Sequence, residues 1–228
     1  MTRTVASPAM TPAARPDTRT SEHPLAAMLA AAASGSFPPP DGSLTVLPPA
    51  NDVHAVVAFS AHSLLLTDHT QADVEARGVD AYGGSMHPDH QRWLAGHRLI
   101  GSLDVVLVRR ATGRIHNVEQ PTVDLDHPRV RRAELHRRDV RVAADDRGLV
   151  TIGRGLVDRW EISVELFDGV PHGLGAGRAL IDTGLAMLPQ GALVWAQVAA
   201  GNTASLRAFL GAGFVPICSE VLFSHRPD

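Results

Sequence analysis

The sequence predicts an α/β protein, and three features of its local pattern lead to this prediction. Residues 53–67 form a β-branched, apolar run that is typical of buried strands. The tetrapeptide Asp145-Asp146-Arg147-Gly148 separates two apolar segments and has the composition of a hairpin turn. A glycine-rich stretch, residues 168–177, connects a strand pattern to a helix pattern. Strands and helices are therefore both expected along the chain.

The N-terminal half is expected to begin with a disordered tail and then to mix helices and strands. Residues 1–22 are rich in Thr, Ala, Pro and Arg and show no periodicity. Pro24 suits the first turn of an Ala-rich helix that extends to residue 33, and the prolines after Phe37 form a stiff turn. The other expected elements are a helix over residues 88–95, one strand or two over 53–67, and strands over 103–108 and 114–118.

The C-terminal half shows a more regular order of elements. Three helices are expected, over residues 128–138, 175–187 and 202–210. The expected strands cover residues 140–144, 149–157, 159–167 and 192–198, with one or two closing strands over 214–223.

Composition narrows the range of partners and compartments. A chain of 228 residues can form one large domain, or a domain with an added lobe, and its net charge of −3 provides no basic field for nucleic acid or a membrane surface. Cys218 is the only cysteine, so no intrachain disulfide can form. No apolar run reaches the roughly 18 residues of a membrane span. We therefore expect a cytoplasmic protein with no nucleic-acid or membrane partner.

The strongest local signal is the glycine-rich stretch from Asp168 to Gly177. Glycines allow successive backbone N–H groups to converge on one point, and the following helix adds the positive end of its dipole. This geometry suits a pyrophosphate. Glycines also end strands and start helices for purely structural reasons, so this stretch alone leaves both explanations open.

A second segment, GNTASLRAFLGAGF at residues 201–214, favours the pyrophosphate interpretation of the glycine-rich stretch. An R/Q-x-x-G-x-G/A loop, followed after a strand by an N-x-x-A/S helix that carries an aromatic residue and ends in G-F, is the hallmark of the GNAT superfamily of N-acetyltransferases. From about residue 128 to 228 the chain resembles that family. The resemblance implies a mixed, mostly antiparallel sheet flanked by helices, with acetyl-CoA or a related acyl-CoA as cosubstrate and an amine as acceptor.

The resemblance also implies which residues bind the cofactor. The loop amides that would hold the CoA pyrophosphate belong to His172, Gly173, Leu174, Gly175, Ala176, Gly177 and Arg178. The backbone of Val164 and Leu166 would pair with the pantetheine arm, on a strand that opens away from its neighbour, and Asn202 would head the helix beside the cofactor. Two positions depart from the family pattern, because His172 stands where Arg or Gln is usual and Phe209 stands where many members have a Tyr that protonates the leaving thiolate.

Residues 159–167 alternate between apolar and polar side chains, which places Glu161, Ser163 and Glu165 on one face of the expected strand. Transfer to an amine needs a base, because an alkylammonium is not a nucleophile at neutral pH. Glu161 lies eleven residues before His172, where the histone-acetyltransferase branch of the family places its base. Glu161 and Glu165 are therefore the candidate catalytic residues. The alternative is that both pair with Arg154 and Arg159 within the sheet.

We expect no metal site, although His87, His90 and His97 cluster in the sequence, and Ser85 or Asp89 is the expected N-cap of the nearby helix. The expected division of the chain is a tail over residues 1–22, an N-terminal α/β lobe of unknown role over 23–112, and a GNAT-like acyl-CoA-binding domain over 113–228. Two further functions remain open, a CoA-binding protein without turnover and a protein-interaction module. A homodimer remains open as well.

Overall fold

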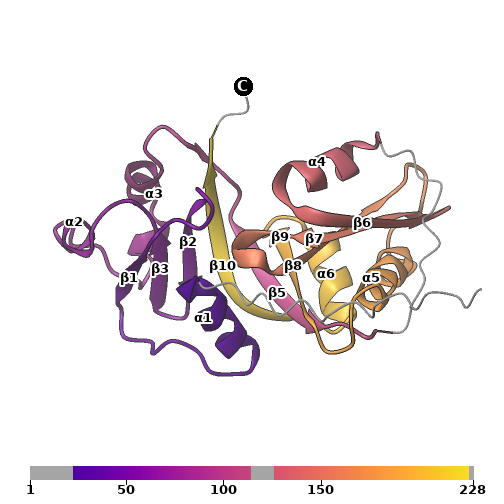
Figure 1. The fold of residues 1–228 in the computed structure, drawn as a ribbon, viewed down its shortest axis with the longest axis horizontal. Helices are drawn as coiled ribbons and strands as arrows, with labels where there is room; N and C mark the ends of the chain where they lie inside the picture. The colour runs from indigo at the N-terminus through magenta and orange to yellow at the C-terminus, as the bar shows by residue number, and fades with distance from the viewer. Residues whose placement is uncertain (1–22, 114–125, 226–228) are drawn as a thin grey trace, which may run out of the picture.

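The computed structural model describes residues 23–113 and 126–225, and within these ranges the strands form one sheet (Figure 1). The strand order is β1-β3-β2-β10-β5-β9-β8-β7-β6, with the short β4 added beside β10. The strands are β1 (Leu44–Leu47), β2 (His54–Phe59), β3 (His62–Leu66), β4 (Leu99–Ile100), β5 (Asp104–Arg110), β6 (Arg138–Asp145), β7 (Gly148–Arg154), β8 (Trp160–Leu166), β9 (Leu193–Ala199) and β10 (Val215–Ser224). The helices are α1 (Pro24–Ala33), α2 (Gln71–Glu75), α3 (Pro88–Ala95), α4 (Pro128–His136), α5 (Ala176–Ala186) and α6 (Thr203–Gly211), with short 3₁₀ turns at Gly84–Met86 and Leu156–Asp158.

The sheet is mixed and mostly antiparallel, as predicted. Of the described strands, only the β1–β3 and β8–β9 pairs are parallel, and every other adjacent pair on the path is antiparallel. Helices cover the sheet on both faces, and an N-terminal α/β lobe precedes the strands of the C-terminal half. The predicted fold class is therefore confirmed. Among the described residues, no helix has the length and hydropathy that a membrane crossing requires.

Three of the helices begin with the same dipeptide, His-Pro. In α1, α3 and α4 the proline occupies the first turn, where its missing N–H costs no hydrogen bond. The preceding His23, His87 and His127 are the N-caps, and each ring accepts a hydrogen bond from the backbone N–H two residues later. The expectation that Ser85 or Asp89 caps α3 is wrong, because the Nδ1 atom of His87 takes that role.

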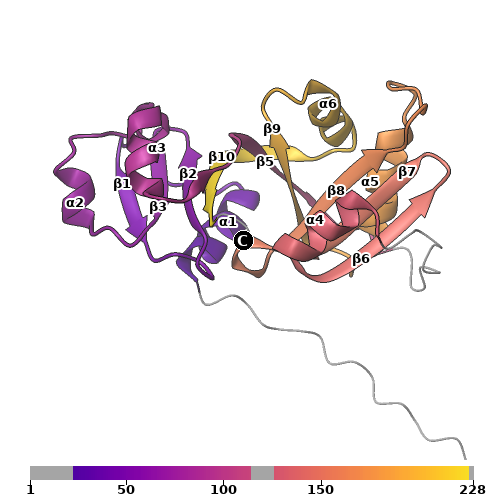
Figure 2. The ribbon, with the colours of Figure 1, turned by 90° about the horizontal axis from the view of Figure 1, so that it is seen from above.

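Helices lie on opposite faces of the C-terminal strands (Figure 2). The apolar face of β8 packs with Val150 and Ile152 of β7 against α5, in a core that includes Leu180 and Leu185. Helix α4 lies on the other face, since its Arg129 reaches Glu165 of β8. The alternation read from residues 159–167 thus separates the α5 face of the strand from the α4 face.

The N-terminal strands are also covered on both faces. Helix α1 packs through Leu25 and Leu29 in a core with Val57 and Leu64. The opposite face of the same strands packs against α3, where Leu94 joins Phe223. The run at residues 53–67 forms two strands joined by a tight turn. Strands β1 and β4 and helix α2 were not expected from the sequence, and the strand expected at residues 114–118 lies outside the described residues, as does the tail.

Strands from both halves of the chain interleave in the middle of the sheet. The C-terminal β10 pairs with β2 on one side and with β5 on the other, and β5 in turn pairs with β9. Figure 1 shows β10 and β5 running between the two groups of strands. The expected boundary near residue 113 stays a prediction, and this pairing means that β10 completes the N-terminal lobe.

His90 on α3 provides a test of the N-terminal packing. Its side chain is buried, and neither ring nitrogen has a hydrogen-bond partner among the described residues. Burial lowers the pKa of His90 from 6.5 to about 4, with Arg77 and His69 adding to the effect. The unfolded chain therefore binds a proton that the folded protein does not between these two pH values. The stability that neutral His90 contributes is present above pH 6.5 and is lost as the pH falls towards 4.

We expect the substitution His90→Phe to remove this pH dependence. Chemical denaturation of both proteins between about pH 7 and pH 4 measures the free energy of unfolding. The difference between them should move in favour of the variant as the pH falls. A difference that stays constant over this range would show that His90 does not titrate differently in the folded state.

Candidate functional site

Among the described residues, strand β8 is paired along one edge and mostly free along the other. All of its residues pair with β7, but only Trp160 and Glu161 pair with β9. The two parallel strands start side by side, and β9 continues to Ala199. The gap between them therefore opens towards the C-terminal end of β8, where the glycine-rich loop begins.

Backbone direction shows which groups of β8 face this gap. The carbonyl oxygen of Arg159 accepts from Gly155, and the N–H of Phe167 donates to Arg147, both on the β7 side. Backbone groups alternate in direction along a strand, so the even-numbered residues direct theirs towards β9. Val164 and Leu166 are among them, and no described strand pairs with them there.

The glycine-rich loop holds backbone N–H groups that no other part of the described chain uses. Gly173 and Gly175 have φ angles of +84° and +87°, in the left-handed region that favours glycine, and Gly175 is the N-cap of α5. A Cβ atom at either position would meet no atom within 4 Å. No hydrogen bond to a described residue is made by the N–H groups of residues 173–175, and the first N–H groups of α5 have no partner within the helix.

The other loop residues lie at the surface. His172 and Arg178 are exposed, and Leu174 is 79% exposed at the tip of the loop. Ala176 and Gly177 form the first turn of α5, of which Ala176 is buried. The loop therefore presents backbone groups and the side chains of His172 and Arg178 to solvent, at the open end of the β8–β9 gap.

Residues 201–214, the second sequence motif, form α6 and its ends, and α6 packs against α5, the helix that follows the glycine-rich loop. Asn202 is the N-cap of α6, and its side-chain oxygen accepts a hydrogen bond from the N–H of Ser205. Helix α6 approaches α5 closely, since a Cβ atom on Gly177 would lie 3.7 Å from that of Ala208. Phe209 is buried in the core in an edge-to-face contact with Phe214. The aromatic position of the motif therefore serves packing in this protein.

Glu161 lies at the centre of a buried ionic cluster. Its Oε2 atom accepts from Arg137 at 3.0 Å, and its Oε1 atom accepts from Arg159 at 2.8 Å and from Gln197 at 2.6 Å. Burial alone raises the pKa of Glu161, but the two guanidinium groups outweigh it and hold the pKa below its usual value. Both carboxylate oxygens are thus occupied, and the carboxylate is a weak base.

Arg159 links this cluster to the C-terminal strand. Its Nη2 atom donates to Glu220 of β10 at 2.7 Å, and both side chains are almost fully buried. Burial raises the pKa of Glu220 although Arg159 opposes the shift, and the second oxygen of Glu220 has no hydrogen-bond partner among the described residues. Sequence reasoning missed Arg137, Gln197 and Glu220, because each comes from a different element and only the fold brings them together.

Glu165 has a different environment, in the part of β8 beyond the β9 pairing. Its one charged partner in the described ranges is Arg129 of α4, at 2.6 Å, and the Glu165 side chain is 36% exposed. The alternative expectation from the sequence, that the two glutamates pair with Arg154 and Arg159, holds only in part. Arg159 pairs with Glu161, whereas Arg154 lies over the ring of Trp160 instead.

The histidine cluster does not assemble into a ligand set. His87 caps α3, and His90 is buried beside Trp93. In the part of the chain that the structure describes, no three His, Cys, Asp or Glu side chains come together as metal ligands would.

Two solved structures similar to this chain come from the GNAT family, the family that the two motifs resemble. An acetyltransferase of that family from Colwellia psychrerythraea is 9% identical, with a TM-score of 0.34 over 61% of this chain and 62% of its own length. A protein from Novosphingobium aromaticivorans, described as a GNAT-family acetyltransferase, is 16% identical, with a TM-score of 0.35 over 58% of this chain and 69% of its own. No family profile and no curated protein matches the chain.

Proposed function

We propose that this protein is an N-acyltransferase that moves an acetyl or related acyl group from acyl-CoA to an amine. The observation that carries the proposal is the edge of β8 that no described strand pairs with. It leads directly into a loop whose backbone N–H groups have no partner among the described residues, at the start of α5. The pantetheine arm carries amides that can pair with the even-numbered residues of β8 like an added strand. The pyrophosphate suits the N–H groups of the loop and the positive end of the helix dipole.

The reaction needs one nucleophile, one base and stabilisation of one developing charge. The neutral amine attacks the thioester carbonyl carbon, the C–S bond breaks, and the CoA thiolate leaves. A backbone N–H of β8 that faces the gap stabilises the negative charge on the carbonyl oxygen. The acceptor arrives as an ammonium, which loses one proton to the base before the attack, and the nitrogen loses a second proton to solvent once the C–N bond has formed. The thiolate takes one from water, because Phe209 has no hydroxyl to donate.

Glu165 is the better of the two candidate bases, and Glu161 positions the strand. Glu161 is buried, and both of its oxygens are held by cationic and amide donors, which reduces its driving force for taking a proton. Glu165 is partly exposed, and the partner that the described structure gives it, Arg129, can be displaced. An incoming ammonium group can compete with that guanidinium, so Glu165 can both attract the acceptor and deprotonate it.

Substitution of Glu165 by Gln tests this assignment. We expect turnover to fall by roughly 10²–10⁴-fold at neutral pH, while the affinity for acetyl-CoA stays the same. The defect should shrink as the pH rises, because more of the amine is then already neutral. Release of free thiol from acetyl-CoA in the presence of an amine library measures turnover, with mass spectrometry to identify products. The matched control is Glu134→Gln, an exposed glutamate on α4. Equal rates for the variant and the wild type would remove Glu165 from the chemistry.

A CoA-binding protein without turnover is the second candidate, and the burial of Phe209 favours it, since no hydroxyl stands at that position. The same assay separates the two. Binding of acetyl-CoA without thiol release across the amine library would support the second candidate, whereas failure to bind any acyl-CoA would overturn both.

A further inference from the structure

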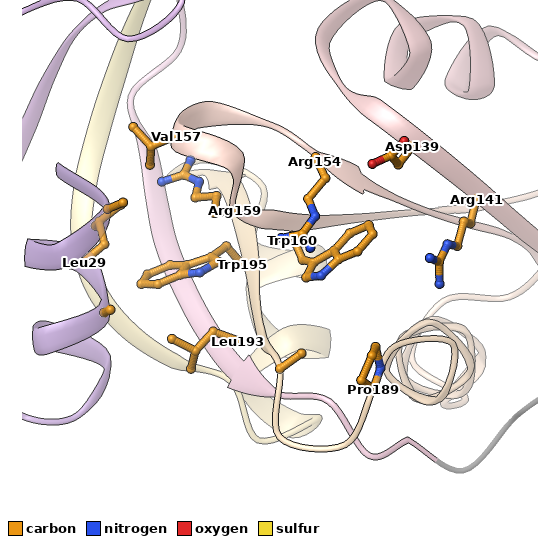
Figure 3. Close-up of a pocket in the computed structure, with 13 residues that line it drawn as sticks. Leu29, Asp139, Arg141, Arg154, Val157, Arg159, Trp160, Pro189, Leu193 and Trp195 are labelled. Atoms are coloured by element: carbon orange, nitrogen blue, oxygen red, sulfur yellow. The ribbon is translucent and has the colours of Figure 1, made fainter. Parts of the chain in front are cut away.

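A cavity of about 590 Å³ lies at the end of the sheet opposite the glycine-rich loop. Its walls come from α1, from β6 to β9 and from the segment before β8 (Figure 3). The apolar part of the lining includes Leu29 of α1, Leu193 of β9, and Trp160 and Trp195. This volume is within the range of small-molecule sites, which are largely apolar with a few polar groups that fix orientation.

The cavity is separate from the proposed acyl-CoA site. Trp160 is the first residue of β8 and Leu166 the last, so the two ends of the strand lie about 20 Å apart at the usual rise per residue. The paired residues at the starts of β8 and β9 also stand between the cavity and the open part of the gap. A ligand in the cavity therefore needs no contact with the loop, and the inference does not depend on the proposed function.

Two arginines on the lining, Arg141 and Arg154, make no ion pair with a carboxylate of the described residues. Arg154 lies 3.9 Å over the ring of Trp160 and donates one hydrogen bond to the carbonyl oxygen of Asp158. Arg141 lies 5.1 Å from the same ring and donates to the carbonyl oxygen of Met187. Figure 3 shows both guanidinium groups on the Trp160 side of the cavity. Each retains N–H groups that a ligand can use.

The other charges on the lining leave a small positive excess. Arg159 is balanced by Glu161 and Glu220. Asp139 makes no ion pair with a described residue, so Arg141, Arg154 and Asp139 together carry 2 − 1 = +1. A guanidinium group binds a carboxylate through two parallel hydrogen bonds, which makes a monoanion the matching ligand.

The backbone around the cavity is held in an unusual conformation. Val157 and Asp139, both on the lining, have φ angles of +47° and +52°, and the neighbouring Asp158 has +62°. For a β-branched residue such as Val157 this region is a steric outlier. Strain of this kind persists where the surroundings over-determine it, and such sites are enriched at ligand pockets.

We propose that this cavity binds a small organic monoanion, with a carboxylate between Arg141 and Arg154 and an apolar body against Leu29, Leu193 and Trp195. The ligand is defined by two requirements, one negative charge and an uncharged apolar part. Asp139 restricts the site by disfavouring a second negative charge.

The probe is 4-phenylbutyrate, with its uncharged amide, 4-phenylbutyramide, as the matched ligand. We expect calorimetric titration of the full-length protein to show the carboxylate binding at least about tenfold tighter than the amide, because only the carboxylate accepts charge-assisted hydrogen bonds. The chain has three tryptophans, so the indole N–H signals in an NMR spectrum report the location. Those of Trp160 and Trp195 should shift, and that of Trp93, on α3, should not.

Three variants complete the test. Arg154→Gln should weaken binding of the carboxylate by about tenfold, and Asp139→Asn should strengthen it, with the asparagine tolerating the positive φ. Arg147→Gln, an exposed arginine at the other end of the β6–β7 hairpin, is the control and should bind as the wild type does. The NMR spectrum of each variant verifies its fold. Equal binding of acid and amide, binding unaffected by both Arg154→Gln and Asp139→Asn, or no binding of the acid at millimolar concentration would each overturn the proposal.

Discussion

Replacing Gly175 with Glu is expected to abolish the binding of acetyl-CoA and of CoA. Gly175 has a φ angle of +87°, and an added Cβ would point into the open space in front of the loop. A glutamate side chain would fill the position proposed for the phosphates, and its carboxylate would repel them. The rise in melting temperature that we expect CoA to produce in the wild type should therefore be absent, and calorimetry should detect no binding.

A control is needed because any side chain at a positive φ costs about 1–2 kcal/mol of stability. Gly78 is suitable, since its φ angle is +62°, an added Cβ there also meets nothing within 4 Å, and it lies in the other lobe. Gly78→Glu should lower the melting temperature to a similar extent while keeping the response to CoA. Gly175→Ala should retain part of the affinity, because it adds strain without charge. Wild-type affinity in Gly175→Glu would place the phosphate site elsewhere.

Glu161→Gln should lower the free energy of unfolding by about 3–5 kcal/mol, the range for breaking a buried ion pair from one side. The substitution keeps the shape of the side chain but removes the charge that balances Arg159 and Arg137 inside the protein. Because Glu220 still pairs with Arg159, Arg137 is left with the greater deficit. Chemical denaturation at neutral pH measures the effect.

Two further variants show whether this loss comes from the buried pair. Glu134→Gln removes an exposed glutamate and should change stability by less than about 0.5 kcal/mol. In the double variant Glu161→Gln with Arg137→Met the loss should be smaller than the sum of the single losses, since no unpaired guanidinium remains at that position. If Glu161→Gln is as stable as the wild type but has lost most of its turnover, Glu161 is the base and our assignment of Glu165 is wrong.

Local features of the sequence determined most of the helices and strands of this protein and the residue types at its candidate site, although β1, β4 and α2 were not expected. The His-Pro starts of three helices, the turn at Asp145–Gly148 and the alternation along residues 159–167 act through neighbours in the chain. The glycine-rich loop and the polar face of β8 could also be predicted, because they too depend on residues that are close together in the chain. Backbone conformation and side-chain periodicity depend on residues a few positions apart.

Only the tertiary structure decided which strands lie beside each other and which charges meet. Glu220 and Arg159 are 61 residues apart, and they form an ion pair because β10 crosses into the middle of the sheet. The cavity likewise lies between α1 and the starts of β8 and β9, which the fold brings to the same place. Such contacts depend on strand order and register, which residue periodicity does not specify. The pairing of Glu161 with Arg159 could therefore be proposed from the sequence, whereas the contacts with Arg137 and Gln197 could not.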